Sequence, residues 1–398
     1  MAMHPSSFRQ TNKASLVQYE GVFRERMSLI EGAALITSGT IGAGVLGIPF
    51  VVATVGVWIG MVYIITLGCL MMGLNLLIGE LAIRTGEPLQ LVGLARRYLG
   101  PWGARLMTVL MYALLFGVLN VYIIGEGETL AALFGGSSFA WSLGFFVVVT
   151  CLIALGMRTV KTIEVALSFG ILFVLLAIIF FSTPHITLPY WQHSDITLLL
   201  FPYGVLLFAF HGTTAIPEAH ALLRNRDTAF RKAIIMASTI CMIVYALFAL
   251  VVVGVTGPET TEIATIGLGY ALGPAVLIFG NVFAALAMGT GFLMAGLALR
   301  DSLQWDMKLG AKPATMLATG VPLLLFLLGI RQFIATIDLV GGIVMSMEML
   351  LILLIYWKAK QRKTVAPGPV MLRHTPLLIA ALILAFSVGI VYSFMKLF

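Results

Sequence analysis

The chain has 398 residues, of which 60% are hydrophobic and 10% are charged, and its mean hydropathy is +1.04. No soluble domain needs so much apolar surface, so the composition excludes an ordinary water-soluble protein and predicts an all-α, polytopic protein in the lipid bilayer. The net charge of +7 would suit nucleic acid, but the basic residues lie in short segments between apolar runs, which indicates membrane orientation and no nucleic-acid partner.

Eleven apolar runs are long enough to cross a bilayer. The first run is too long for the core of a signal peptide and follows a polar tail, so we expect no cleaved leader. With this tail in the cytoplasm, 22 of the 24 Lys and Arg residues fall on the inner side, which predicts a cytoplasmic N-terminus and an external C-terminus. The eleven spans are 28–55, 57–81, 104–134, 139–157, 162–182, 196–223, 233–256, 268–298, 314–330, 333–357 and 376–397.

The first span is interrupted at its centre by G-T-I-G-A-G-V-L-G-I-P, Gly39 to Pro49. Each glycine in a helix interior costs about 1 kcal/mol relative to alanine, and proline removes a helical hydrogen bond. Unwound backbone at membrane depth is tolerated where it is buried in protein or lines a cavity, as in the substrate sites of transporters. The sequence therefore predicts a broken helix. The alternative is a continuous helix whose glycines pack against another helix.

The third span contains two carboxylates near its outer half, Glu126 and Glu128. Charged side chains inside a span are unfavourable and usually face a cavity or a partner, so both are functional candidates. The alternative is that the span ends earlier and both lie in external water. Just before this span, residues 87–101 have apolar side chains at helical spacing beside two arginines, which predicts a short amphipathic helix on the inner membrane surface.

The three cysteines, Cys69, Cys151 and Cys241, all fall within predicted spans. They have no metal-ligand spacing and none lies in an external loop, so we predict buried thiols, no disulfide and no bound metal.

The sixth span contains a second interruption, L-F-A-F-H-G-T-T-A-I-P-E-A, Leu207 to Ala219. The first span opens one set of five helices, and the sixth opens the next five in the opposite orientation. Interrupted spans at matching positions of two halves are typical of inverted-repeat transporters. The tenth span also carries Asp338 and Glu348. We expect a tail (1–27), a first repeat (28–182), an outer loop (183–195), a second repeat (196–357), a basic linker (358–375) and a further helix (376–398).

The two interruptions resemble sequences of known permeases. G-T-I-G-A-G-V-L-G-I-P resembles the first-helix signature of the amino acid/auxin permeases and of the bacterial tryptophan and tyrosine permeases. F-A-F-H-G-T-T-A-I-P is similar to the F-x-F-H-G segment in the sixth helix of the same proteins. The resemblance covers residues 28–397. It implies the amino acid–polyamine–organocation superfamily and its LeuT-type fold of five plus five inverted helices, here with one extra C-terminal helix.

That fold implies a site for an amino acid between the two interruptions. The carboxylate would meet N–H groups of the first, and the ammonium would meet carbonyl groups of the second, in agreement with the partial charges at helix ends. Phe208 and Phe210 could contact an apolar or aromatic substrate, or pack in the core. The implied residues are Thr40, Ile41, Gly42, Ala43 and Gly44 for the carboxylate, and Phe208, Ala209, Phe210 and His211 for the ammonium and side chain.

The coupling ion is a proton or sodium. Sodium-driven relatives use two adjacent hydroxyl side chains on helix 8, where the aromatic permeases have Ser-Ser and this chain has Thr290-Gly291. One hydroxyl is missing, which weakens the case for sodium but leaves Thr290 as a ligand. Proton coupling needs a titratable group, and His211, Glu126 and Glu128 are the candidates. The alternative role for His211 is a structural hydrogen bond.

These features predict a secondary active transporter that imports an amino acid, apolar or aromatic in preference, across the plasma membrane by alternating access. No phosphate-binding loop and no catalytic or metal-ligand cluster is present in the sequence, so we expect neither an enzyme, nor ATP as the energy source, nor a cofactor. The alternatives are a sodium symporter and an amino-acid-sensing receptor on a permease scaffold. A metal transporter of the same fold is disfavoured because neither interruption offers an Asp or a Met. The oligomeric state stays open.

Overall fold

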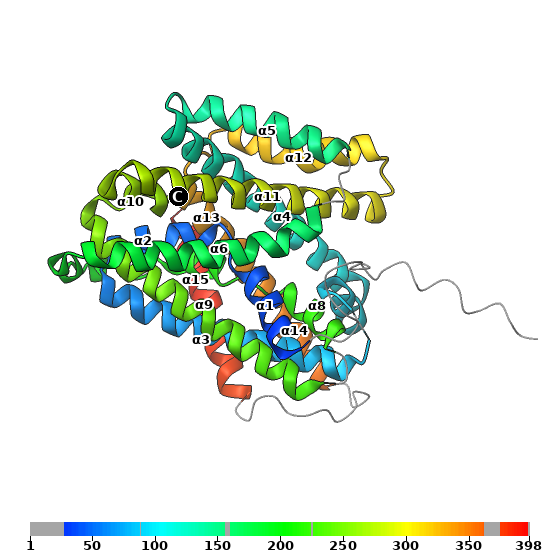
Figure 1. Cartoon of the computed structure of the whole chain (residues 1–398). Coiled ribbons are helices and arrows are strands. Elements are labelled where there is room, and N and C mark those ends of the chain that lie inside the picture. Colours follow the sequence, from blue (N-terminus) through cyan, green and yellow to red (C-terminus); the bar gives the residue numbers. More distant parts are fainter. Residues whose placement is uncertain (1–27, 88, 156–159, 224–225, 362–374, 397–398) are drawn as a thin grey trace, which may run out of the picture.

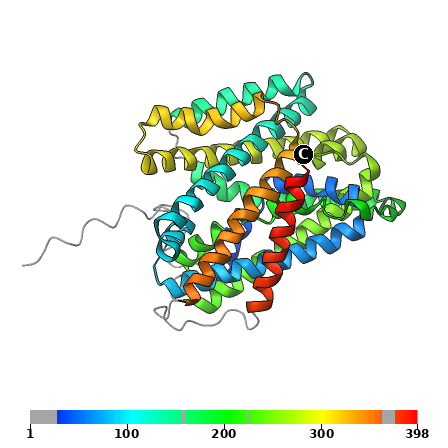
Figure 2. The same cartoon turned by 180° about the vertical axis from the view of Figure 1, so that it is seen from behind.

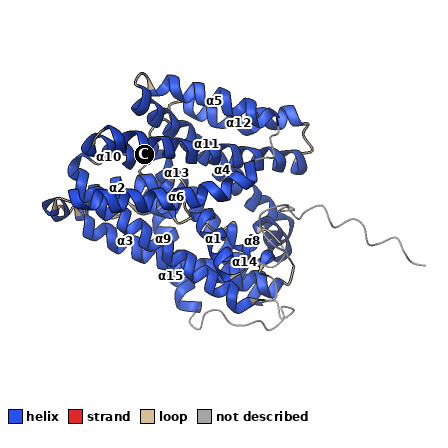
Figure 3. Ribbon diagram, in the orientation of Figure 1, coloured by secondary structure: helices blue, strands red, loops and turns tan. Residues whose placement is uncertain are grey.

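The protein is described by a computed structural model over residues 28–87, 89–155, 160–223, 226–361 and 375–396, with the backbone alone for residues 160–169 and 171. Every regular element in this part of the chain is a helix (Figure 3). The all-α prediction is therefore confirmed. The predicted tail, and the predicted basic linker from residue 362 to residue 374, lie outside the described residues.

Figure 1 shows the helices, coloured in chain order from blue to red. The first half contains α1 (Leu29–Thr40), α2 (Gly44–Val55), α3 (Val57–Thr85), α4 (Leu91–Phe134), α5 (Ser138–Leu155), α6 (Val160–Ser182) and the short helices η1 (Thr183–His185), η2 (Leu188–Gln192) and η3 (Ile196–Leu198). The second half contains α7 (Tyr203–Ala209), α8 (Ala215–Leu222), α9 (Asp227–Thr256), η4 (Gly257–Glu259), α10 (Ala264–Leu272), α11 (Pro274–Asp306), α12 (Ala311–Leu327), α13 (Phe333–Leu339), the π-helix η5 (Val340–Met345), α14 (Ser346–Gln361) and α15 (Thr375–Met395).

Judged by length and composition, the described residues contain fewer candidate membrane spans than the eleven that the sequence predicts. Among the described residues, seven helices are long and apolar enough to cross a bilayer, and the bent pair of α1 and α2 forms an eighth candidate. α12 and the part of α6 from residue 172 are shorter apolar helices. α7 and α8 have only seven and eight residues. The count of eleven spans and the domain boundaries therefore stay predictions.

Two predicted elements differ in detail from the observed ones. The predicted span 268–298 is divided, because Gly273 has φ of 100° and Pro274 lacks the N–H that would continue a helix. α10 and α11 therefore replace one helix. The predicted amphipathic segment is the first part of α4, which Gly100 (φ 77°, ψ −164°) separates from the part that follows.

The buried thiols predicted from the sequence are confirmed at one position out of three. Cys241 on α9 is buried, whereas Cys69 on α3 and Cys151 on α5 lie exposed on the protein surface, and all three are free. The prediction was wrong for two residues because a span can turn an apolar side chain toward lipid as readily as toward protein.

The helix pairs α1/α2 and α7/α8, which contain the two interruptions, are held in place by the helices around them. α9 packs against α1, α2 and α3, and α7 packs against α2 and the π-helix η5. α11 lies along α4, with α5 and α12 beside them at the top of Figure 1. α15 runs beside α14 and also contacts η5 (Figure 2). The extra C-terminal helix is therefore attached to the tenth predicted span.

Candidate functional site

The first span breaks between α1 and α2, where the glycine-rich sequence predicts it. α1 ends at Thr40, α2 begins at Gly44, and their axes are bent by 63°. Ile41 closes the last turn of α1 and then leaves the helical conformation, with φ of −78° and ψ of 104°. Among the described residues, the backbone N–H groups of Gly42, Ala43 and Gly44 donate to no other backbone group. These donors, at the positive end of α2, suit a carboxylate. The alternative of one continuous helix is wrong.

The second break lies between α7 and α8. α7 ends at Ala209, where the Phe210 N–H donates to Leu206 O at 2.9 Å, and α8 begins at Ala215. The His211 N–H then donates to Phe208 O at 3.2 Å. The carbonyl groups of this last turn carry the partial negative charge of a helix C-terminus, which suits an ammonium group.

Glycines bring the two breaks into direct contact. A Cβ atom at Gly44 would lie 2.8 Å from Phe208 Cδ1 and 3.0 Å from Ala209 Cα, so the start of α2 reaches the backbone at the end of α7 only because Gly44 has no side chain. Gly212 lies equally close to the side chain of Thr40. By contrast, a Cβ at Gly42 would meet only Tyr122 Oη, at 4.0 Å. Gly42 therefore faces more open space than Gly44.

Tyr245 on α9 connects the two breaks by hydrogen bonds. Its hydroxyl lies 2.9 Å from Ala209 O at the end of α7 and 3.3 Å from Thr40 O at the end of α1. The side chain is fully buried. One phenol group from a third helix therefore holds the last carbonyl groups of both half-helices in place.

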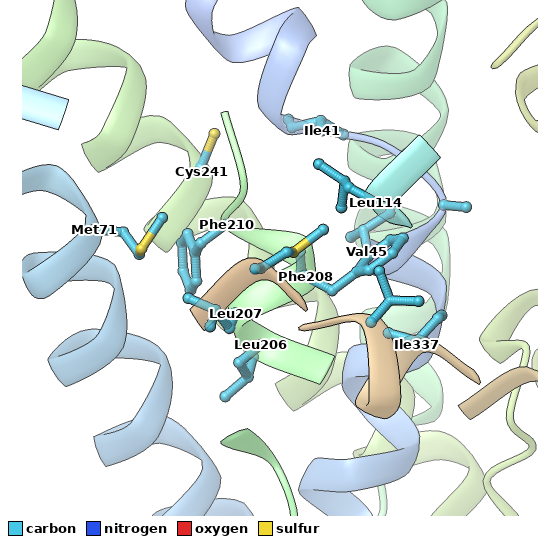
Figure 4. Packing of buried hydrophobic residues seen from close by; sticks show 14 of the residues in the cluster. Ile41, Val45, Met71, Leu114, Leu206, Leu207, Phe208, Phe210, Cys241 and Ile337 are labelled. Atoms are coloured by element: carbon cyan, nitrogen blue, oxygen red, sulfur yellow. The ribbon is translucent and has the colours of Figure 1, made fainter. Parts of the chain in front are cut away.

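The two phenylalanines of the second break point in different directions (Figure 4). Phe208 lies toward Val45 on α2, next to Gly44. Phe210 lies toward Met71 on α3, and its ring centroid is 5.0 Å from that of Tyr245. Phe208 is thus placed between the two breaks, whereas Phe210 packs against the supporting helices.

His211 forms a pair with a buried carboxylate from another span. Its Nε2 lies 3.0 Å from Glu348 Oε2 on α14 and 3.2 Å from Thr213 Oγ1 within the break. The Glu348 side chain is completely buried, and the His211 side chain is 11% exposed. A titratable pair therefore connects the sixth predicted span to the tenth.

The other coupling candidates form a second group on α4 and α11. Glu126 is buried within α4, which continues to Phe134, so the alternative that Glu126 lies in external water beyond the helix is wrong. Its Oε1 would lie 3.0 Å from a Cβ at Gly289 on α11, next to Thr290. Glu128 is half-buried on the same helix. Among the described residues, the hydrogen bonds of the His211 side chain go to Glu348 and Thr213, and neither goes to Glu126 or Glu128.

The Thr290 hydroxyl is hydrogen-bonded within its own helix. The Thr290 hydroxyl donates to carbonyl oxygens of its own helix, Leu286 O at 2.8 Å and Ala287 O at 3.1 Å. A Cβ at Gly291 would lie 2.7 Å from the ring and from the hydroxyl of Tyr122 on α4. Tyr122 therefore fills the space beside the position where the sodium-driven pattern has its second hydroxyl.

Comparison with known proteins identifies the family. The model of the tryptophan/tyrosine permease family matches residues 25–393. The chain belongs to this family. A glutamine transporter of Aliivibrio fischeri is 26% identical over 351 residues, which cover 84% of this permease and 90% of the relative. A tyrosine-specific transport system of Haemophilus influenzae is 26% identical over 361 residues, covering 84% and 89%. The permease family consists of transporters, so the protein is not an enzyme.

Solved structures confirm the fold of the permease. MhsT in complex with L-phenylalanine matches with a TM-score of 0.59 over 94% of this chain and 100% of that chain. A manganese transporter of Eremococcus coleocola matches with a TM-score of 0.64 over 92% and 86%. Both share the LeuT-type architecture, and at 14% identity each shows the fold alone.

The sequence analysis missed the groups that support the two breaks. Glu348 carried the signal that marked Glu126, a carboxylate within an apolar span, but its partner on another span was not predictable from spacing. Tyr245 and Tyr122 carried no signal, because a tyrosine in a span is ordinary. Only the fold of the permease brings these side chains to the breaks.

Proposed function

We propose that the permease is a secondary active transporter that imports an amino acid across the plasma membrane by alternating access, coupled to protons. The observation that carries the proposal is the contact of the two breaks at Gly44, with N–H donors of α2 on one side and the carbonyl end of α7 on the other. A zwitterionic amino acid satisfies both ends at once. The assigned site residues are Thr40, Ile41, Gly42, Ala43 and Gly44 together with Phe208, Ala209, Phe210 and His211.

An amino acid is the substrate class that the relatives support. They are named for glutamine and tyrosine transport, and the solved structure of MhsT holds L-phenylalanine. We propose an apolar or aromatic substrate, because Ile41, Ala43 and Phe208 at the breaks are apolar and buried. The manganese transporter with the same fold does not change this proposal, since neither break offers an Asp or a Met.

Proton coupling is favoured over sodium coupling by the surroundings of Thr290. Gly291 provides no second hydroxyl beside that of Thr290. A hard cation needs several oxygen ligands. His211 lies in the second break, and its imidazole can bind and release a proton. The distribution of Lys and Arg supports a cytoplasmic N-terminus and an external C-terminus.

The test is uptake of labelled amino acids into proteoliposomes that contain the purified full-length permease. A proton gradient and a sodium gradient are imposed separately at the same membrane potential. We expect uptake with the proton gradient alone. Uptake that requires sodium would contradict the coupling but keep the substrate class, whereas binding without any uptake would favour the receptor alternative.

A further inference from the structure

Glu348 is a buried carboxylate to which the sequence assigned no role. Its side chain is 0% exposed, its Oε2 lies 3.0 Å from His211 Nε2, and its Oε1 has no hydrogen-bond partner among the described residues. A lone carboxylate in such surroundings is strongly unfavourable. We propose that His211 and Glu348 together form the proton-binding site of the permease. This inference deepens the proposed function and rests on it.

The geometry gives the proton a specific place. His211 Nε2 faces two groups, Glu348 Oε2 at 3.0 Å and Thr213 Oγ1 at 3.2 Å. A ring nitrogen carries either one proton or one lone pair. With a proton, Nε2 donates to the Glu348 carboxylate, and without it, Nε2 accepts from the Thr213 hydroxyl. One proton thus decides whether His211 is tied to α14 or to its own break.

The proton step is a simple transfer. A hydronium ion gives a proton to the lone pair of Nε2, an N–H bond forms, and a water molecule is left. His211 is the more accessible member of the pair, with 11% of its side chain exposed, so the proton enters there. Glu348 then neutralises the imidazolium, so proton uptake removes the single negative charge that the pair carries when His211 is neutral. Release on the other side of the membrane reverses these changes.

The proton state acts on the substrate site through the backbone. The His211 N–H donates to Phe208 O at 3.2 Å, so the residue that holds the proton also closes the last turn of α7. Gly212 contacts Thr40 of the first break directly. A change of partner at Nε2 therefore moves the carbonyl groups that we assign to the substrate ammonium.

Two charged pairs lie on the helices and helix ends that surround the site. Glu80 and Arg84 on α3 are paired at 2.6 Å, and Asp338 on α13 is paired with Lys396 next to α15 at 2.7 Å. The remaining titratable side chains on helices that pack against the pair include Tyr356 on α14, which donates to Glu80, Tyr245 on α9, which bonds to the two breaks, and Tyr122 on α4, which lies beside Gly291.

The first experiment compares the wild type with Glu348→Gln in proteoliposomes. Gln keeps the shape of the side chain but cannot hold or neutralise the proton. We expect accumulation driven by the proton gradient to fall to a ratio near 1, while counterflow exchange at equal pH falls far less, by about threefold. Asp338→Asn, which removes a buried carboxylate from the same span, is the matched control and should keep its accumulation ratio.

The outcomes separate the two proposals. Proton-driven accumulation that persists in Glu348→Gln overturns the site and leaves the proposed function intact. Equal loss of accumulation and exchange also overturns the site, because it indicates a structural role. Sodium-dependent uptake by the wild type overturns the proposed proton coupling, and the site with it.

A second variant tests the site even if Glu348→Gln does not fold. Thr213→Val removes the partner of the deprotonated Nε2, so the protonated state becomes relatively more stable. We expect the midpoint of the pH profile of substrate affinity, measured by binding to the detergent-purified wild type and variant between pH 5 and pH 9, to move upward by roughly one unit. An unchanged or lower midpoint overturns the proposal.

Discussion

The hydroxyl of Tyr245 is the smallest group whose removal should disturb both breaks together. Tyr245→Phe deletes one oxygen atom and keeps the ring that packs against Phe210 at 5.0 Å. Two buried carbonyl groups, Ala209 O and Thr40 O, then lose their donor. The prediction is that the variant folds and reaches the membrane but binds substrate more weakly.

The magnitude follows from the two distances. The bond of 2.9 Å to Ala209 O is a full hydrogen bond, whereas 3.3 Å to Thr40 O adds a weak second interaction. One net hydrogen bond is worth about 1 kcal/mol, and a buried acceptor left without a donor costs roughly a further 1 kcal/mol. If the arrangement of the breaks that binds substrate carries this whole cost, about 2 kcal/mol corresponds to a Kd that is roughly thirtyfold higher.

The assay is equilibrium binding of labelled amino acid to detergent-purified protein, with thermal unfolding measured in parallel. Tyr356→Phe is the matched control, because Tyr356 is also buried and its hydroxyl donates to Glu80 at 3.2 Å, away from the breaks. It should lose similar stability with no change in Kd. A Kd in Tyr245→Phe that stays within twofold of the wild type would refute the role of the hydroxyl in holding the breaks.

Three further predictions concern the glycines, the sodium pattern and the C-terminal helix. Gly44→Ala should raise the Kd by tenfold or more, since its Cβ would lie 3.0 Å from Ala209 Cα, whereas Gly42→Ala should stay within threefold; equal Kd values would place the contact elsewhere. Thr290→Ala should leave transport within about twofold, and a complete loss would support sodium coupling. Lys396→Met should lower the free energy of unfolding by about 1–2 kcal/mol, because it leaves the buried carboxylate of Asp338 (6% exposed) without its cation. Solvent screening at Lys396 (41% exposed) limits the loss. Adding Asp338→Asn should restore most of that loss, and additive losses would contradict the ion pair.

Much of the fold could be predicted from local composition. Runs of apolar residues give the helices, and glycine and proline mark the breaks at Gly39–Pro49 and in the second interruption, because each residue acts through its own backbone. Helix ends inside an apolar run were harder to predict from the sequence. The division at Gly273 depends on a backbone conformation with positive φ, which hydropathy does not reveal. The π-helix Val340–Met345 likewise arises in a segment whose composition is that of any span.

The candidate site likewise has a part that local sequence predicted and a part that it did not. The sequence located both breaks and His211, since these lie in contiguous motifs that resemble permease signatures. The partner of His211 could not be found, because Glu348 lies 137 residues further along the chain and one carboxylate in a span has no preferred partner in sequence. The alternative for Glu126 was decided by the burial of its side chain and by the helix that continues past it.

The supports of the two breaks share one property that a motif search does not reveal. Each comes from a helix outside the broken spans: Tyr245 from α9 and Glu348 from α14. An unwound segment has too few internal hydrogen bonds to fix its own conformation, so neighbouring helices must supply the missing partners. The alternating access that we propose requires those partners to change. A group that changes its hydrogen-bond partner when it gains or loses one proton allows this without breaking a helix. We propose the pair of His211 and Glu348 for that role, whereas the Tyr245 hydroxyl, which bonds to carbonyl groups of both breaks, is the fixed support.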